Sequence, residues 1–372
     1  MPETPYWLAE PAPPIPVRPL DGPADAVVVG GGVTGCAAAL SLAEAGLRVR
    51  LHDAREIAGG ASGRNGGFAL RGGAAPYDVT IESIGREAAR RYWQQTEAAL
   101  DRLESLAGDA FRRTGSLRLA ADDEERDALA VEYEALRADD FSAEWDEELV
   151  GGRFRAAIFH PGDAALQPAR WVRRLAVLAA EAGVEIREHC RVDALDDVEA
   201  EHVLVATDGY PSGLLGPLEG LIVPTRGQMI ATEPLPERLF ECPHYGRHGF
   251  DYWQQTPDGR ILAGGFRDAA LHDEFTAEET TTPQIQAALE AFVAQLVGRP
   301  VAVEHRWAGI FGLVLDFLPV VGRVPGDERL WVAGGYSGHG NVLGLMCGEL
   351  AARAILGDRD PLLDLFEPAR LL

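Results

Sequence analysis

Three glycines near the N-terminus have the spacing of a turn that binds a dinucleotide. Gly30, Gly32 and Gly35 follow an apolar run at 26–29 and open an apolar helical segment. In such a turn the first glycine lets the chain leave the strand, the second lets the backbone approach a pyrophosphate, and the third lets the helix pack on the strand. The helix N-terminus, with Val33 and Thr34, then offers free N–H groups and a partial positive charge. These residues predict a site for a nucleotide diphosphate.

An acidic residue follows the next strand at the distance that this turn requires. Asp53 comes after an apolar run at 47–51, eighteen residues beyond Gly35. A carboxylate at that position accepts hydrogen bonds from an adenosine ribose. A 2′-phosphate would meet this charge, so NADP is disfavoured, whereas NAD and FAD both remain open. Ala54 and Arg55 belong to the same predicted site.

A second glycine-rich segment, at 58–67, suits close approach to a ligand. It contains five glycines, and its backbone N–H groups could cradle a phosphate or lie along a flat heterocycle. The alternative is a flexible surface loop, which the polar side chains between the glycines make the less favoured interpretation. The candidate binding residues here are Ala61, Ser62, Arg64, Asn65, Gly66 and Gly67.

The end of the chain repeats the pattern of a strand, a glycine turn and a helix. A strand at 330–333 leads into the turn 334–340, which contains His339, and then into a helix at 341–356. A second helix N-terminus is therefore expected to face the ligand. Earlier, a buried strand at 202–207 ends in Thr207-Asp208-Gly209, a turn that can also approach a nucleotide.

The elements that position these residues alternate between two architectures. Strand–helix units form the first and last parts, whereas alternation and turns after 225 predict antiparallel strands at 228–232, 249–256 and 260–266 and a helix at 283–296. The predicted fold class is α/β, a Rossmann-like domain interleaved with an α+β substrate domain, with the ligand between them. The predicted divisions are a Pro-rich N-terminal tail at 1–23, a nucleotide domain at 24–80, 150–224 and 305–372, and a substrate domain at 81–149 and 225–304. The tail is expected to be extended, to form no core element and to lie across the surface, held there by its aromatic residues.

Composition narrows the possible partners. The 372 residues carry a net charge of −24, and all 34 basic residues are arginine. Nucleic-acid binding is disfavoured because it needs a basic surface; a negative field could steer a polyamine, although a solvated acidic surface is the favoured interpretation. No apolar run could span a bilayer and no signal peptide is evident, so we expect a cytoplasmic protein without membrane association, a monomer or small homo-oligomer. The four cysteines lack metal-binding spacing, so no metal site is predicted.

Five blocks in order resemble the FAD-dependent D-amino-acid oxidase superfamily, most closely its gamma-glutamylputrescine oxidase and glycine or sarcosine oxidase-like members. The resemblance covers nearly the whole chain. The blocks are the Gly30-x-Gly32-x-x-Gly35 turn, ASGRNGG at 61–67, TRGQ at 225–228, WAG at 307–309 and GYSGHG at 335–340.

The resemblance implies FAD as the cofactor. In the family, the first turn and the acid bind the ADP half, the ASGRNGG loop runs toward the flavin, and the Gly338-His339-Gly340 turn lies near its pyrimidine edge. Relatives that attach flavin covalently use a cysteine where this chain has Ile310 and Phe311, so non-covalent FAD is expected. The resemblance extends the predicted cofactor contacts to Val192, Thr207, Gly209, Gly335, Gly338, His339, Gly340 and Asn341.

The resemblance also implies the chemistry. Hydride would leave the carbon beside a neutral amine for flavin N5, and water would hydrolyse the imine. Oxygen is a possible acceptor, giving hydrogen peroxide, but relatives use a lysine for it where this chain has 262–267, ending in Arg267. Oxidase and dehydrogenase therefore both remain open. A different class is a flavin-binding subunit that passes electrons to a partner.

The substrate prediction rests on a missing arginine. Amino-acid oxidases of the family carry a carboxylate-binding arginine after the WAG-like block, where this chain has 310–313 without one. A small amine is therefore the expected substrate, and the alternative is an amino-acid oxidase whose arginine is relocated. The candidate catalytic residues are Arg267, His339, Tyr252 and Arg306; Phe68 and Trp253 are further cavity candidates, although Tyr252 and Trp253 could equally be core aromatics.

Overall fold

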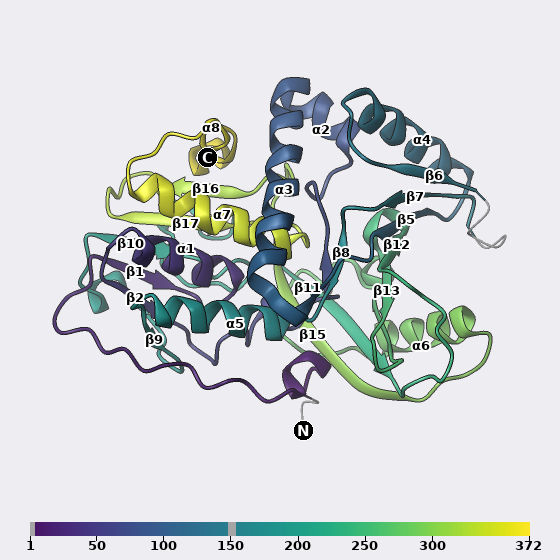
Figure 1. Ribbon diagram of the computed structural model, residues 1–372, viewed down its shortest axis with the longest axis horizontal. Helices are drawn as coiled ribbons and strands as arrows, with labels where there is room; N and C mark the ends of the chain where they lie inside the picture. The colour runs from purple at the N-terminus through teal and green to yellow at the C-terminus, as the bar shows by residue number, and fades with distance from the viewer. Residues whose placement is uncertain (1–3, 148–153) are drawn as a thin grey trace.

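A computed structural model describes residues 4–147 and 154–372 of the chain (Figure 1). Within these residues, a six-stranded sheet has the order β16-β17-β10-β1-β2-β9. All neighbouring strands pair in parallel except β16, which runs antiparallel to β17. The strands are β1 (Ala26–Val29), β2 (Val49–His52), β9 (Glu185–Arg187), β10 (His202–Val205), β16 (Val320–Arg323) and β17 (Leu330–Gly334). The wholly buried, apolar β1 is typical of a parallel strand covered on both faces.

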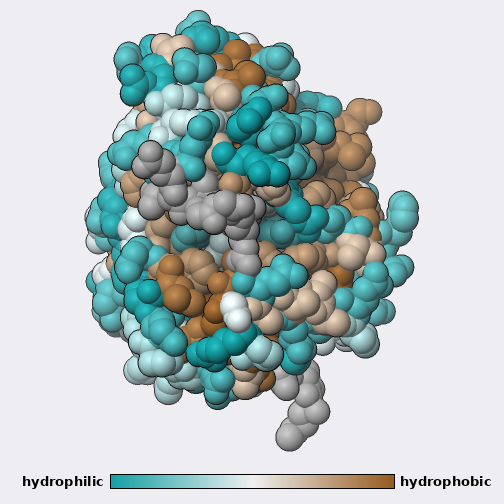
Figure 2. All heavy atoms as spheres, turned by 90° about the vertical axis from the view of Figure 1, so that its right-hand side faces the viewer, coloured by the Kyte–Doolittle hydropathy of each residue, from teal (hydrophilic) through white to brown (hydrophobic). Residues whose placement is uncertain are grey.

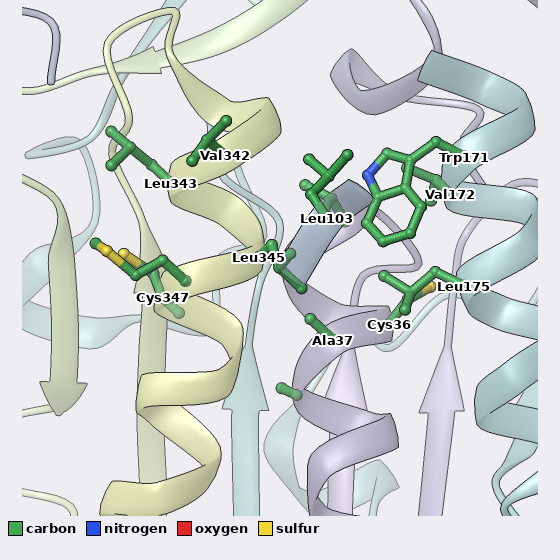
Figure 3. Packing of buried hydrophobic residues seen from close by; sticks show 14 of the residues in the cluster. Cys36, Ala37, Leu103, Trp171, Val172, Leu175, Val342, Leu343, Leu345 and Cys347 are labelled. Carbon is green, nitrogen blue, oxygen red and sulfur yellow. The ribbon is translucent and has the colours of Figure 1, made fainter. Parts of the chain in front are cut away.

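Three helices, α1, α5 and α7, cover one side of this sheet, and a fourth, α3, packs against α5 and α7. Helix α1 contacts both α5 and α7, and α3 contacts α7 in turn. Figure 3 shows side chains from the four helices meeting in one core, with Cys36 and Ala37 of α1 between α5 and α7. The bounds are α1 (Val33–Glu44), α3 (Arg86–Ala107), α5 (Pro168–Glu181), α7 (Gly340–Ile355) and α8 (Pro361–Phe366).

Small residues bring α1 and α7 unusually close. A Cβ atom on Gly348 would lie 2.4 Å from the carbonyl oxygen of Thr34, and one on Gly344 would lie 2.5 Å from Cγ1 of Val33. Thr34 Oγ1 also shares a hydrogen bond of 2.9 Å with the hydroxyl of Tyr336, just before α7. The two helix N-termini are thereby held side by side at the same edge of the sheet.

A second, eight-stranded sheet forms the other half of the described chain, in the order β15-β11-β14-β13-β12-β5-β7-β6. Its pairs are antiparallel except β12 with β5. Helix α6 packs against β11 and β14, while α4 packs against β5 and β7. The bounds are β5 (Ser116–Ala120), β6 (Glu144–Asp146), β7 (Ala156–His160), β11 (Val223–Thr232), β12 (His244–Gly246), β13 (Asp251–Gln255), β14 (Ile261–Gly265), β15 (Val303–Leu313), α2 (Tyr77–Ile84), α4 (Asp123–Ala138) and α6 (Pro283–Val297).

A small third sheet lies between the two halves. It has the order β3-β8-β4, with bounds β3 (Phe68–Ala69), β4 (Phe111–Arg112) and β8 (Ala164–Leu166). Because β3 follows the glycine-rich segment directly, this sheet fixes the end of that segment. The predicted α/β class, with a Rossmann-like sheet and an antiparallel sheet visited alternately, is confirmed, while the exact domain boundaries stay a prediction.

Aromatic residues hold the N-terminal tail against the rest of the molecule, but the expectation that the tail forms no core element is wrong. Residues Tyr6–Ala9 form a short 3-10 helix, and Trp7 is buried in the main core with its Nε1 donating to the carbonyl of Asn65 at 2.8 Å. The prolines do prevent a longer helix, but Pro5 at the N-cap is compatible with a single turn. The turn supports the back of the glycine-rich segment.

The surface fits the acidic composition. Figure 2 shows one side of the molecule, where hydrophilic residues cover much of the face and apolar residues gather in patches between them. Within residues 4–147 and 154–372, no helix combines the length and apolar character needed to cross a membrane.

Candidate cofactor and substrate site

Two adjoining cavities lie where the two halves of the chain meet. The first, of about 360 Å³, lies at the carboxyl ends of β1, β2 and β10, where parallel sheets bind ligands. The second, of about 230 Å³, lies between the glycine-rich segment and the antiparallel sheet. Five residues line both cavities: Ala61, Asn65, Phe311, Gly338 and Asn341. The cavities therefore form one elongated site.

The predicted glycine turn forms the floor of the first cavity. Gly30 has φ of +114°, and a Cβ atom there would lie 2.6 Å from the carbonyl oxygen of Ala206 in the neighbouring strand end. A Cβ atom on Gly35 would lie 1.8 Å from the carbonyl oxygen of Gly30. Only glycine permits this approach, which leaves the start of α1 open toward the cavity.

The acid after β2 is held by backbone groups. Asp53 lines the first cavity, and its Oδ2 accepts from the N–H of Gly31 at 2.6 Å while Oδ1 accepts from the N–H of Arg55 at 2.7 Å. Burial raises the pKa of Asp53. Each oxygen keeps a second lone pair, so the carboxylate can still accept from a ribose hydroxyl.

A cluster of side chains from distant segments closes one side of the first cavity. Arg55 binds Glu279 at 2.8 Å and stacks on Tyr210, with its guanidinium carbon 4.8 Å from the ring centroid. Glu279 also accepts from the hydroxyl of Tyr210 and lies 3.6 Å from Arg64. Glu279 belongs to the segment 271–282, which reaches from the second half of the chain. The charge of Arg55 is therefore already matched by a carboxylate.

The glycine-rich segment is tied down at several points, unlike a flexible loop. Arg64 donates to the carbonyls of Gly59 at 2.8 Å and Ala308 at 3.2 Å, and its own carbonyl accepts from Trp307 at 2.7 Å. Asn65 and Asn341 exchange hydrogen bonds of 3.0 and 3.2 Å between their side chains. These bonds join the ASGRNGG block to the WAG block and to Asn341, the residue that follows the GYSGHG block.

One residue of the Thr207-Asp208-Gly209 turn joins three parts of the site. Asp208 has left-handed φ of 50°, and its carboxylate accepts from the N–H of Gly312 and of Gly335, each at 2.8 Å. Burial raises the pKa of Asp208. The turn was predicted as a nucleotide contact through its neighbours, but the sequence gives no sign that Asp208 itself connects β10 to β15 and β17.

The second cavity is aromatic and contains one distinctive cation. Tyr252 and Phe68 lie edge to face with centroids 6.0 Å apart, and burial raises the pKa of Tyr252 to about 12. Arg267 lies over the rings of Phe250 and Phe311, at 4.5 and 5.7 Å from their centroids. Burial lowers the pKa of Arg267. Of the residues that the structure describes, none provides Arg267 with an ion pair or hydrogen bond, and no lining residue of this cavity is acidic.

His339 stands where the second cavity meets the start of α7. It is the N-cap residue of α7, and its Nδ1 is buried without a hydrogen-bond partner among the described residues. Burial lowers the pKa of His339 to about 4. The imidazole is therefore neutral at pH 7.

Other predicted residues lie elsewhere. Arg306, on β15, does not reach the cavity: its guanidinium binds Glu290 at 2.7 Å and Gln286 at 3.1 Å on α6. Trp253 is a core residue stacked on His244, with ring centroids 5.1 Å apart. Gly35, Gly67, Gly209 and Gly335 lie behind the cavity walls, where close packing leaves no room for a side chain.

The remaining predicted residues line one cavity or the other. Those in the first are Gly30, Gly32, Val33, Thr34, Asp53, Ala54, Arg55, Ser62, Val192, Thr207 and Gly340. Those in the second are Arg64, Gly66, Phe68, Tyr252, Arg267 and His339. Lining residues that the sequence did not indicate include Tyr210 in the first cavity and Tyr245, His248 and Phe317 in the second. Tyr210 directly follows the predicted Thr207-Asp208-Gly209 turn, whereas Tyr245, His248 and Phe317 lie outside every predicted block.

Comparisons with known proteins identify similar chains. Residues 25–354 match the family described as FAD dependent oxidoreductase. The chain is 31% identical over 368 residues to gamma-glutamylputrescine oxidoreductase of Escherichia coli (strain K12), covering 90% of this chain and 84% of the relative. It is 30% identical over 364 residues to a glycine oxidase of Pseudomonas putida, covering 91% and 96%. A crystal structure of glycine oxidase from Geobacillus kaustophilus has the same fold, with a TM-score of 0.77 at 22% identity over 94% of this chain and 99% of that one.

Proposed function

The chain belongs to the family of FAD-dependent oxidoreductases, and on this premise we propose that it oxidises the carbon–nitrogen bond of a small amine that also carries a carboxylate. The observation that carries this proposal is Arg267, an arginine without an ion pair among the described residues, in a cavity without acidic lining residues. The proposal keeps the amine oxidation that the sequence predicts and adds a carboxylate to the substrate. Arg267 takes the place of the arginine that is missing after the WAG block.

The residues present fit FAD along the elongated site. The glycine turn, the open start of α1 and Asp53 suit the ADP half in the first cavity, and Ser62 links this turn to the glycine-rich segment by accepting from the N–H of Val33 at 3.1 Å. Asn65, Gly338 and Asn341, shared by both cavities, suit the passage toward the isoalloxazine ring. Ile310 and Phe311 offer no thiol, which supports non-covalent binding.

FAD, when bound, supplies the acceptor for the hydride that leaves the carbon next to the amine nitrogen. The protein's own part is to orient and desolvate the substrate. Arg267 can hold a carboxylate by charge-assisted hydrogen bonds. Phe68, Tyr252 and Phe311 line an apolar wall that excludes water, and the phenol of Tyr252 is a hydrogen-bond donor at neutral pH.

A neutral His339 adds no positive charge beside the substrate amine. Because burial lowers its pKa to about 4, the imidazole at the start of α7 can exchange hydrogen bonds without repelling a cationic amine. Arg267 is then the candidate cation for an oxygen reaction, so oxygen as acceptor, with hydrogen peroxide as product, is part of the proposal. Electron transfer to a protein partner is the competing outcome.

An amine without a carboxylate is the second candidate. The net charge of −24 favours the approach of a cation. Both candidates use the same cavity and cofactor, and they differ only in whether Arg267 is engaged.

Anaerobic reduction of the bound flavin tests the proposal. Purified holoprotein would be mixed with a panel of polyamines, simple amines and D-, L- and N-methyl amino acids, and bleaching of the flavin absorbance followed. Air would then be admitted and peroxide assayed. We expect bleaching by carboxylate-bearing amines and peroxide on reoxidation. Protein that takes up no FAD, or flavin that no member of the panel reduces, would refute the proposal.

A further inference from the structure

Two turns at the edge of the second cavity carry unusual backbone strain. Arg247, His248 and Gly249 are consecutive residues with φ of 46°, 54° and 83°, and Phe266, just before Arg267, has φ of 59°. Non-glycine residues in this region cost about 1–2 kcal/mol each. The turns are neighbours because Asp251 pairs with Gly265 across β13 and β14, and the N–H of Phe266 donates to the carbonyl of Phe250 at 2.6 Å. Such strain persists only where surrounding contacts hold it.

Arg247 provides those contacts. It binds Asp251 through Nε and Nη2, each at 2.7 Å, and Asp268 through Nη1 at 2.8 Å. Its guanidinium carbon also lies 5.1 Å from the ring centroid of Phe266. One arginine thus joins the start of β13, the strained residue before Arg267 and the acidic residue after it.

The two carboxylates whose fields reach Arg267 are both engaged by other arginines. Asp268 and Glu274 are the acidic groups that act on the Arg267 charge. Asp268 is bound by Arg247, and Glu274 is buried against Arg226 at 2.8 Å, with Gln228 donating to it at 3.0 Å. Within the described part of the chain, Arg267 therefore has no ion pair, although an aspartate follows it directly.

We propose that Arg247 is a positioning residue for substrate binding, which holds Asp268 away from Arg267 so that the Arg267 guanidinium stays available to a substrate carboxylate. This inference rests on the proposed function of the cavity. Without Arg247, the carboxylate of Asp268, which follows Arg267 in the chain, loses its arginine partner and becomes an internal competitor for Arg267. The effect of Arg247 on carboxylate ligands should then depend on the charge of Asp268.

The test measures carboxylate binding to holoprotein without turnover. Benzoate is titrated while the visible absorption of bound FAD is followed, with uncharged benzamide as the matched ligand. The variants are Arg247→Gln, Asp268→Asn, the double variant Arg247→Gln/Asp268→Asn, and the milder Arg247→Lys. Circular dichroism and FAD content check that each is folded.

We expect Arg247→Gln to weaken benzoate binding by about 10- to 100-fold, the range for one charge-assisted hydrogen-bonded contact. The double variant should recover to within about threefold of the wild type, and Asp268→Asn alone should bind benzoate as the wild type does. Benzamide binding should change little in all of them. If Arg247→Gln does not fold, Arg247→Lys takes its place, with benzoate affinity expected to fall about 3- to 10-fold. Asp268→Asn must then restore that affinity in the same way.

Two results would overturn the inference. Weak benzoate binding that Asp268→Asn fails to rescue means that Arg247 only stabilises the turns, and unchanged binding in Arg247→Gln means that it has no role in this site. Arg267→Met separates these failures from a failure of the proposed function. If that variant binds benzoate as well as the wild type does, Arg267 is not the carboxylate site.

Discussion

Arg267 keeps a guanidinium beside aromatic rings, and no carboxylate of residues 4–147 or 154–372 binds it; a partly buried charge of this kind costs free energy unless a ligand pairs with it. The rings of Phe250 and Phe311 offset part of that cost through cation–π contacts. A substrate carboxylate would offset the remaining cost. Arg267 is therefore suited to binding a ligand and not to stabilising the fold.

Substitution of this arginine should affect carboxylate-bearing substrates selectively. Arg267→Met removes the charge but keeps an apolar side chain, and we expect the half-saturating concentration of such a substrate to rise about 10- to 100-fold, equivalent to about 1.5–3 kcal/mol. Steady-state or anaerobic titration measures this. Arg306→Met is the matched control, because Arg306 does not line the cavity and loses a hydrogen bond to Gln286 and a part-exposed pair with Glu290, a pair expected to contribute about 1 kcal/mol or less to stability. Equal effects of the two variants would argue against a special role for Arg267.

A second residue-scale prediction concerns acid stability. His244 is packed on Trp253, and burial lowers its pKa to about 4 from the ordinary 6.5. The folded state therefore favours the neutral ring, so His244 costs no stability above pH 6.5 and progressively more as the pH falls toward 4. Relative to His244→Asn, the wild type should lose on the order of 3 kcal/mol across that window. Urea unfolding at pH 7 and at pH 4 measures the difference, and a constant difference would show that the ring is not held neutral.

At the scale of elements, the site depends on the crossing of α1 and α7. Gly344 and Gly348 let the α7 backbone touch α1, so that both helix N-termini face the two cavities. Two aligned helix N-termini offer partial positive charge to a pyrophosphate and to a developing negative charge on a ring. The packing and the binding site are thus parts of one arrangement.

A side chain at the crossing of α1 and α7 should disturb both the helix packing and the cofactor site. Gly348→Val places its Cβ atom 2.4 Å from the carbonyl oxygen of Thr34, and we expect it to cost about 1–3 kcal/mol of stability and to reduce FAD retention. Thermal unfolding and flavin content after dialysis measure the two effects. Gly162→Ala is the control, because nothing lies within 4 Å of a Cβ atom there. A fully stable, FAD-replete Gly348→Val protein would contradict the tight crossing.

The segment 271–282 should influence the cofactor through Glu279. Loss of its charge in Glu279→Gln leaves Arg55 and Tyr210 without their shared carboxylate, so we expect the wall of the first cavity to loosen and FAD to dissociate about 5- to 30-fold faster, for about 1–2 kcal/mol of lost interaction. Recovery of free flavin fluorescence on dilution measures the rate. The adjacent, exposed Glu278→Gln should leave it unchanged. Slower dissociation in Glu279→Gln would mean that Glu279 competes with the cofactor for Arg55.

The sequence could predict features that depend on neighbouring residues, but not contacts between residues far apart in the chain. The strand, glycine turn, helix and Asp53 are local, because their spacing alone sets the geometry, and the structure has β1, the turn and α1 in this order, with Asp53 directly after β2 in the wall of the first cavity. Glu279 meets Arg55 across 224 positions of the chain, and Arg306 is neutralised by a helix that only the tertiary structure brings near. Such pairings depend on how the two halves of the chain pack, and the hydrophobic periodicity of the sequence does not encode that packing. For the same reason, the sequence offered Arg267 and Arg306 as equals.

At the scale of the whole molecule, the interleaved chain places a nucleotide-type cavity and an aromatic cavity end to end. The first part of the chain provides the glycine turn and the acid, the middle provides Tyr252 and Arg267, and the last part provides α7 and His339. Each of these three parts of the chain contributes one wall of the elongated site. This arrangement suits a cofactor that lies across both halves and presents its reactive end to a substrate held by the antiparallel sheet.

The most direct test of the central claim compares substrates that differ only in the carboxylate. Anaerobic reduction of the bound flavin would be followed with N-methylglycine against dimethylamine, and with glycine against methylamine, at pH 7 and equal ionic strength. We predict that, in at least one pair, the carboxylate-bearing member reduces the flavin at a half-saturating concentration about tenfold or more below that of its partner. Flavin reduced equally well by both members of each pair, or only by the simple amines, would contradict the account.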